Sequence, residues 1–205
     1  MTVTLVLIAI IVVASFYAWS KPEVYHNWMM NPYQVYTNRQ YYRFLTSAFI
    51  HKDYTHLFFN MFTLFFFGRN IEFIYDYFTG SGFIWYLALF LIGVVISDVP
   101  TYLKNRDNPG YNSLGASGGV AAIVFSSIMF DPTNKICLFG ILCLPGFILG
   151  ALYLIYSYQR GKQQADGVNH DAHLYGALFG IGFSFLVEPR VIFSFVEQLM
   201  DYRLF

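Results

Sequence analysis

The chain has 205 residues, of which 57% are hydrophobic, 21% aromatic and only 12% charged. Soluble domains are about 45–50% apolar and about 25% charged, so this composition disfavours an ordinary soluble enzyme and a disordered chain. Twelve Lys and Arg residues balance twelve Asp and Glu residues, which excludes a net positive field of the kind that recruits nucleic acid. The composition indicates a protein whose surroundings are lipid.

Six segments are candidates for transmembrane helices, which need about 20 mainly apolar residues. The first covers residues 3–19 and carries no charge. A signal peptide is the alternative for this segment, but no basic residues precede it and its end is a poor cleavage context, so we expect a retained helix. The expected spans, which predict one all-α membrane domain over residues 1–205, are 3–19, 56–78, 83–103, 113–130, 135–158 and 170–187.

The connecting segments differ in character. Residues 20–55 are too polar to span the membrane and are rich in aromatic residues, which favour the membrane–water interface. We therefore expect a structured interfacial loop with short helices between the first two spans. Residues 159–169 resemble a loop in water, and residues 188–205 form a tail that could hold a short amphipathic helix on the membrane surface.

Four hydrogen-bonding side chains within the spans are candidates for function, because polar groups at membrane depth are costly and commonly functional. They are His56, Asn60, Ser117 and His173. The first two are four residues apart and share one face of a helix. Each side chain also has a structural interpretation: His and Asn join membrane helices by hydrogen bonds, a serine among glycines packs or caps, and a lone histidine lies at the interface.

Chain direction favours a shared site. In a six-helix serpentine, the second, fourth and sixth helices run the same way, and His56, Ser117 and His173 each lie near the start of one of them. We therefore expect the three side chains at similar depth below one membrane face. Glycines beside Ser117 and His173 would let their helices approach closely, as a Ser–His hydrogen bond of about 2.6–3.2 Å requires.

This arrangement predicts acyl-transfer chemistry. Ser117 would be the nucleophile and His173 the general base. The candidate oxyanion donors are the Ser117 backbone N–H at a helix start, the Asn60 amide and the His56 ring. Asp171 lies two residues before His173 and points elsewhere on a helix, so we expect a dyad rather than a triad.

Other reactive side chains offer weaker alternatives. A metal site is disfavoured because the sequence has no HExxH motif and two histidines three residues apart supply at most two ligands. The residues that it would use are His56, His170, Asp171 and His173. Cys137 and Cys143 lie in one apolar run and cannot form a disulfide framework, so we expect inert small hydrophobic residues.

The ordered set of motifs resembles the rhomboid family of intramembrane serine proteases over about residues 42–187. Tyr42 stands where that family usually has Trp. Each motif is modest alone, and the set is specific. The motifs are Tyr42-Arg43, His56-x-x-x-Asn60, Gly68-x-x-x-Glu72, Gly115-Ala116-Ser117-Gly118 and Ala172-His173-x-x-Gly176-x-x-x-Gly180.

The resemblance implies a six-helix bundle whose site opens to water from one side, with Ser117 and His173 as the catalytic dyad. Substrates would be membrane-anchored proteins cut within or beside a transmembrane segment, without a metal, a cofactor or nucleic acid. The resemblance implies oxyanion and substrate-binding roles for His56, Asn60 and Gly115. It implies structural roles for Arg43, Glu72, Gly176 and Gly180.

The family orientation makes this a multi-pass protein of the cell membrane, with a cytoplasmic N-terminus and a site that faces outward. In that orientation eight Lys and Arg residues lie outside and four lie inside, which is the reverse of the positive-inside rule. We keep the family orientation, because several of the eight belong to the structured first loop.

Two other functions remain open at this point. An inactive rhomboid relative would bind membrane helices without cutting them; such relatives usually lack the nucleophile or the base, and this chain has both. A channel would need polar residues at successive depths, yet here they gather near one face and only Asp98 lies elsewhere. For a protease, we expect residues 159–169, with Gly161 and Gly167, to cover a hydrated site and to gate substrate entry together with the fifth helix.

Overall fold

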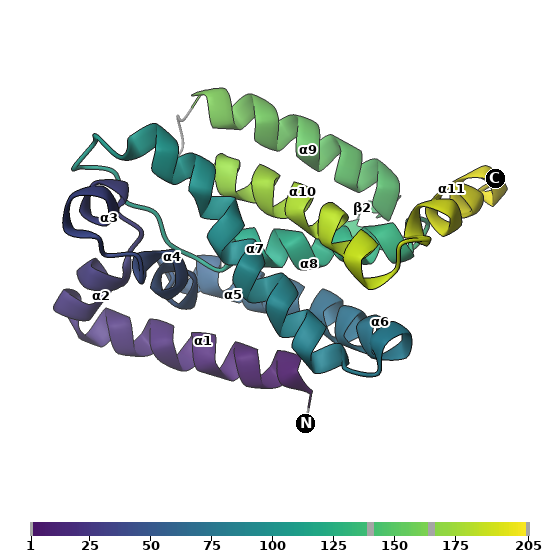
Figure 1. Cartoon of the computed structure of the whole chain (residues 1–205), viewed down its shortest axis with the longest axis horizontal. Helices are drawn as coiled ribbons and strands as arrows, with labels where there is room; N and C mark the ends of the chain where they lie inside the picture. Colours follow the sequence, from purple (N-terminus) through teal and green to yellow (C-terminus); the bar gives the residue numbers. More distant parts are fainter. Residues whose placement is uncertain (1, 139–141, 164–166, 204–205) are drawn as a thin grey trace.

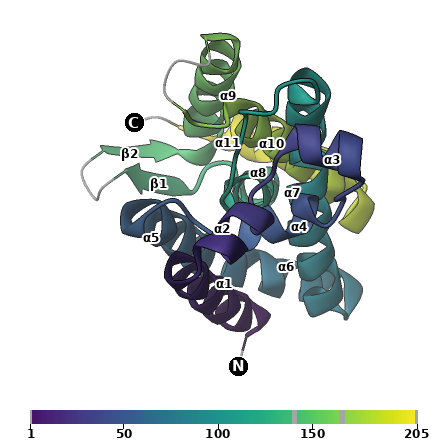
Figure 2. The same ribbon diagram turned by 90° about the vertical axis from the view of Figure 1, so that its left-hand side faces the viewer.

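Figure 1 shows the computed structural model of the chain, which describes residues 2–138, 142–163 and 167–203. The described residues are mainly helical and include one two-stranded hairpin. Helix α8 (Ser117–Phe130) lies at the centre of the molecule (Figure 2), and most of its residues are buried. It packs against α10 (His170–Val187) and α7 (Gly82–Asn105).

Several helices are apolar enough to mark a membrane protein. Among the described residues, three helical stretches have the length and composition to cross a bilayer: α1 (Val3–Ser20), Tyr54–Thr79 and α7. A fourth results if α10 and α11 (Val191–Asp201), which meet at an angle of 110°, are taken together. The stretch Tyr54–Thr79 comprises α5 (Tyr54–Thr63), a π-helical turn η2 (Leu64–Gly68) and α6 (Arg69–Thr79).

Short helices fill the segment between α1 and α5, and Arg43 holds this segment together. The buried Arg43 guanidinium donates hydrogen bonds to the backbone carbonyls of His26 and Met29, at 3.0 and 2.7 Å. Two of the helices begin with proline, which suits a first helical position because its missing N–H would be unpaired there. The helices are α2 (Pro22–Trp28), α3 (Pro32–Asn38), α4 (Arg43–Thr46) and the 3₁₀ turn η1 (Ser47–Phe49).

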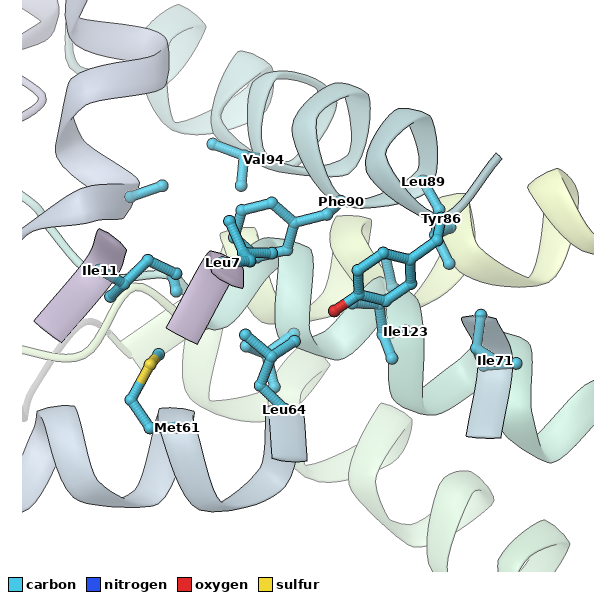
Figure 3. Close-up of a cluster of buried hydrophobic side chains, with 14 of the residues drawn as sticks. Leu7, Ile11, Met61, Leu64, Ile71, Tyr86, Leu89, Phe90, Val94 and Ile123 are labelled. Carbon is cyan, nitrogen blue, oxygen red and sulfur yellow. The ribbon is translucent and has the colours of Figure 1, made fainter. Parts of the chain in front are cut away.

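A hydrophobic core joins α1, α5, α6, α7 and α8 (Figure 3). Its labelled members include Leu7 and Ile11 of α1, Leu64 of η2 and Phe90 of α7. Glu72 of α6 adds a polar tie, because its carboxylate accepts the backbone N–H groups of Val3 and Thr4 at 2.8 and 3.0 Å. These amides open α1, where the helix dipole favours a negative charge.

Small residues let α8 and α10 pack backbone to backbone. A Cβ atom at Gly176 would overlap the carbonyl of Gly118, and one at Gly180 would overlap the carbonyl of Ala122. Side chains at these positions would therefore force the helices apart. This close approach brings the starts of α8 and α10 together.

The expected fifth span, residues 135–158, is wrong in its first part. Residues there form an antiparallel hairpin of β1 (Lys135–Leu138) and β2 (Leu142–Pro145), and α9 begins only after it (Gly146–Gln163). Hydropathy does not separate a short apolar strand from a helix, and Pro145 disfavours a helical residue before it. The two cysteines lie opposite each other in the hairpin and form the disulfide Cys137–Cys143, so the prediction of inert hydrophobic residues was also wrong.

Two further boundaries differ from expectation. The span expected at 113–130 begins as non-helical chain, and helix starts at Ser117. The loop expected at 159–169 is shorter, because α9 continues to Gln163 and places Gly161 inside a helix, where a Cβ would meet Asp171. Gly161 is therefore not a loop hinge. Residues 164–166 of that expected loop lie outside the described residues.

Candidate active site

The strand-like stretch before Ser117 is held by backbone hydrogen bonds to the segment between α1 and α5. Ser113 and Met30 exchange two N–H to carbonyl bonds, at 2.9 and 3.0 Å. The Gly115 N–H then donates to the Ser47 carbonyl at 2.9 Å. These bonds fix the point at which α8 begins, and Ser117 is its first residue.

Ser117 and His173 are in hydrogen-bond contact. His173 Nε2 lies 2.8 Å from Ser117 Oγ, within the range expected for a nucleophile and its base. His173 lies in the first turn of α10, and its backbone N–H donates to the carbonyl of Asn169 at 3.3 Å. The start of α8 and the start of α10 are therefore adjacent in space, as the shared direction of these helices predicts.

Aromatic rings fix the plane of the His173 imidazole. Tyr153 of α9 stacks on it, with ring centroids 6.2 Å apart and an angle of 25° between the planes. His170 meets it edge-on at 5.8 Å and 81°. Tyr153 in turn contacts Phe125 of α8 at 5.7 Å. The base is thereby packed between α8, α9 and its own helix.

His56 lies in the first turn of α5, and Asn60 lies one turn further along the same helix. Asp53 caps this helix by accepting the His56 backbone N–H at 2.8 Å. Asn60 Nδ2 donates to the His56 carbonyl at 2.9 Å, and the amide carries a second hydrogen that can serve a ligand. Both side chains line the cavity that also contains Ser117 and His173.

Gly115 lies against the His56 ring and needs to be glycine. Its φ of +119° is a backbone conformation that L side chains rarely adopt, and a Cβ there would come within 2.5 Å of His56 Cε1. Because its N–H is bonded to Ser47, Gly115 does not offer an amide to an oxyanion. The Ser117 N–H is better placed, since amides in the first turn of a helix lack intrahelical partners, and the first such bond runs from Val120 N to Ala116 O.

His51 is a buried histidine beside the site, and neither hydropathy nor motif spacing indicates it. Its Nε2 accepts the backbone N–H of Ala116 at 3.3 Å, and its Nδ1 lies 3.1 Å from Ser15 Oγ. Ser15 Oγ donates to the Phe49 carbonyl, so Nδ1 must carry the proton and donate to Ser15. Burial, with a smaller effect from His56, lowers the pKa of His51 to about 3, and the neutral ring can therefore accept the Ala116 amide.

A groove of about 890 Å³ runs from the Ser–His pair along α8. Its walls come from α5, α8, the hairpin, α9 and α10, and the hairpin lies between α5 and α9 (Figure 2). Polar residues line one end, including Asn112 and Lys52. Apolar residues line the other end, including Ile128, Ile136 and Leu149. An extended or helical peptide with an apolar half would match this gradient.

Of the four residues of the alternative metal site, Asp171 is paired with a side chain of another helix. Within the described parts of the chain, no group of three or more His, Cys, Asp or Glu side chains could hold a metal ion. Asp171 forms an ion pair with Lys104 at 2.7 Å, so it does not face His173 as a third member of a triad.

Fold and site together define a class: a helical membrane protein with a serine and a histidine in contact at the head of a groove. The family model described as "Rhomboid domain" matches residues 38–190, more than half of the chain. The chain therefore belongs to the rhomboid family, which confirms the resemblance seen in its motifs. It is also 30% identical over 142 residues to "RHOMBOID-like protein 12, mitochondrial" of Arabidopsis thaliana. That match covers 65% of this chain and 42% of the relative, so the chain spans less than half of that protein.

Proposed function

We propose that this protein is an intramembrane serine endopeptidase that cleaves membrane-anchored proteins within or beside a transmembrane segment. The observation that carries the proposal is the 2.8 Å contact between His173 Nε2 and Ser117 Oγ at the head of the groove. Family membership supports the same reaction.

The reaction follows from the positions of these groups. Ser117 Oγ attacks the scissile carbonyl carbon while His173 Nε2 takes its proton. The Ser117 N–H, the His56 ring and the second Asn60 amide hydrogen stabilise the oxyanion. His173 then gives its proton to the leaving amine, which breaks the peptide bond and leaves an acyl–Ser117 ester. A water molecule that loses its proton to His173 attacks the ester, and collapse returns the proton to Ser117 and releases the carboxylate product.

The membrane setting suits this chemistry. Six spans, formed by α1, the stretch of α5 to α6, α7, α8, α9 and α10, would place the polar end of the groove near water and its apolar end in lipid. Hydrolysis needs water, and polar groups do not function in dry hydrocarbon. We propose a multi-pass protein of the cell membrane with a cytoplasmic N-terminus and an outward-facing site.

The test is cleavage of a single-span reporter protein by the purified chain in liposomes. The wild type is expected to cut near the membrane boundary of the reporter, and Ser117→Ala and His173→Ala are expected to lose the activity. Matched controls are Ser20→Ala and His26→Ala, because both side chains are exposed and lie outside the groove. Both controls are expected to cut at the wild-type rate.

The same assay separates the alternatives. A wild type that binds the reporter in the membrane without cutting it would support an inactive rhomboid relative. Cleavage that persists unchanged in Ser117→Ala would overturn the proposed mechanism.

A further inference from the structure

The last turns of α7 present buried polar side chains that the proposed reaction does not use. Asp98 and Thr101 are three residues apart, on one helix face, and are 8% and 1% exposed. A carboxyl group in the buried part of an apolar helix is costly and calls for a partner. Both side chains bond to Asn169 at the start of α10, and the Ser47 side chain also lies against the Asp98 carboxyl group.

Asn169 joins three parts of the molecule. Its Oδ1 accepts the Ala172 backbone N–H at 3.1 Å, which caps the helix that carries His173, and it also accepts the Thr101 hydroxyl at 2.9 Å. Its Nδ2 donates to Asp98 Oδ1 at 3.2 Å and lies 3.5 Å from Ser113 Oγ. A backbone N–H can only donate, so the Ala172 contact fixes Oδ1 toward the helix and leaves Nδ2 to face Asp98.

This contact set lies beside Ser117. Asp98, Asn169 and Ser117 line one small cavity, together with Ser113. The carbonyl of Asn169 also accepts the His173 N–H. The Asn169 side chain therefore holds the start of α10 to α7, and the Asn169 carbonyl bonds to the helical turn that carries His173.

We propose that Asp98 is a positioning residue that acts through Asn169: it fixes the start of α10 and so keeps His173 Nε2 within hydrogen-bond distance of Ser117 Oγ. The inference rests on the proposed protease function. A displacement of about 1 Å in a catalytic group can lower a rate by about 100-fold, so a loosened cap would act on the chemical step rather than on binding of the substrate.

Four substitutions test this role. Asp98→Ala removes the acceptor, whereas Asp98→Asn keeps an oxygen that can accept from Asn169. Asn169→Ser keeps an oxygen that can cap α10 but removes the Nδ2 donor to Asp98. Lys104→Gln is the control: Lys104 follows Thr101 by three residues in α7, is exposed, and the substitution breaks its ion pair with Asp171, in which the lysine side chain is 48% exposed.

The measurements are kcat and KM for the membrane reporter, the rate at which a fluorophosphonate labels Ser117, and the thermal midpoint of each purified variant. Asp98→Ala and Asn169→Ser are expected to lower kcat by about 10- to 100-fold while KM stays within about twofold. Asp98→Asn and Lys104→Gln are expected to stay within about threefold of the wild type. Labelling should slow in parallel with kcat.

The outcomes separate this inference from the proposed function. If the wild type is active and Asn169→Ser and Asp98→Ala keep its kcat, or if they change KM alone, the positioning role is overturned and the protease proposal stands. If Asp98→Ala does not fold, Asn169→Ser compared with Asp98→Asn decides the question alone. A wild type that neither cleaves nor labels would overturn both.

Discussion

The imidazole of His51 accepts a hydrogen bond from the backbone N–H of Ala116, the residue directly before Ser117. The ring is fully buried, and its other nitrogen is bonded to Ser15 of α1. One neutral histidine therefore connects the first helix to the start of the nucleophile helix. If the ring gained a proton on Nε2, that atom could no longer accept the Ala116 amide.

His51 should make stability depend on pH. Its pKa is lowered from 6.5 to about 3 by burial and by His56, against an opposing effect of Asp53. Between those values the unfolded chain binds a proton that the folded chain does not, so stability falls as the pH is lowered from about 6.5 toward about 3, by at most about 1.4 kcal/mol per pH unit. Thermal midpoints in detergent from pH 4 to pH 7 measure this loss.

The matched variants are His51→Gln and His26→Gln. The first is expected to flatten the pH dependence over this range, and the second, at an exposed position, to leave it as in the wild type. Equal slopes for the wild type and His51→Gln would show that His51 is not the group responsible.

Gly115→Ala should damage the site. The new side chain would sit at a φ of +119° and press against the His56 ring, which costs about 1–3 kcal/mol in backbone strain alone and displaces a proposed oxyanion donor. Gly110→Ala is the control, because its nearest neighbour would be Asn108 Oδ1 at 3.5 Å, and we expect a change within about 0.5 kcal/mol. Thermal unfolding and reporter cleavage measure both variants. Full activity in Gly115→Ala would show that position 115 does not need to be glycine.

Two glycines on one helix should respond in opposite directions. Gly180→Ala would push α10 away from the Ala122 backbone, at a cost of about 1–3 kcal/mol from overpacking. Gly182→Ala meets nothing within 4 Å and should be neutral or stabilise the helix by up to about 1 kcal/mol. Thermal midpoints of the two variants test the backbone contact between α8 and α10. If both substitutions lower the midpoint, or both raise it, the contact is refuted.

Glu72→Gln should loosen the start of α1. The substitution removes the charge that faces the helix N-terminus and weakens the bonds to the Val3 and Thr4 amides, at a cost of about 0.3–2 kcal/mol. Glu188→Gln is the control, since the bond that the Glu188 carboxylate accepts from Arg190 N is exposed. Hydrogen exchange of the first turn of α1 should rise in Glu72→Gln and not in Glu188→Gln. Unchanged hydrogen exchange in Glu72→Gln would show that the Glu72 carboxylate does not stabilise the start of α1.

Hydropathy predicts the helical membrane class and the short motifs predict the rhomboid family, because both are local signals in the sequence. Chain direction also indicated that Ser117 and His173 start neighbouring helices. The hairpin was missed since Cys137 and its neighbours are as apolar as a helix would be. His51 and Asn169 were missed because each acts on backbone N–H groups that hydropathy and motif spacing do not reveal.

The most direct test of the account is covalent labelling of Ser117. The wild-type chain in liposomes is treated with a fluorophosphonate probe, and the labelled peptide is identified by mass spectrometry, beside Ser117→Ala, His173→Ala and the Ser20→Ala control. The account predicts that the probe attaches at Ser117 in the wild type and in Ser20→Ala, that Ser117→Ala is not labelled and that His173→Ala is labelled at least about 100-fold more slowly. Labelling at another residue, or equal labelling of the wild type and His173→Ala, would contradict it.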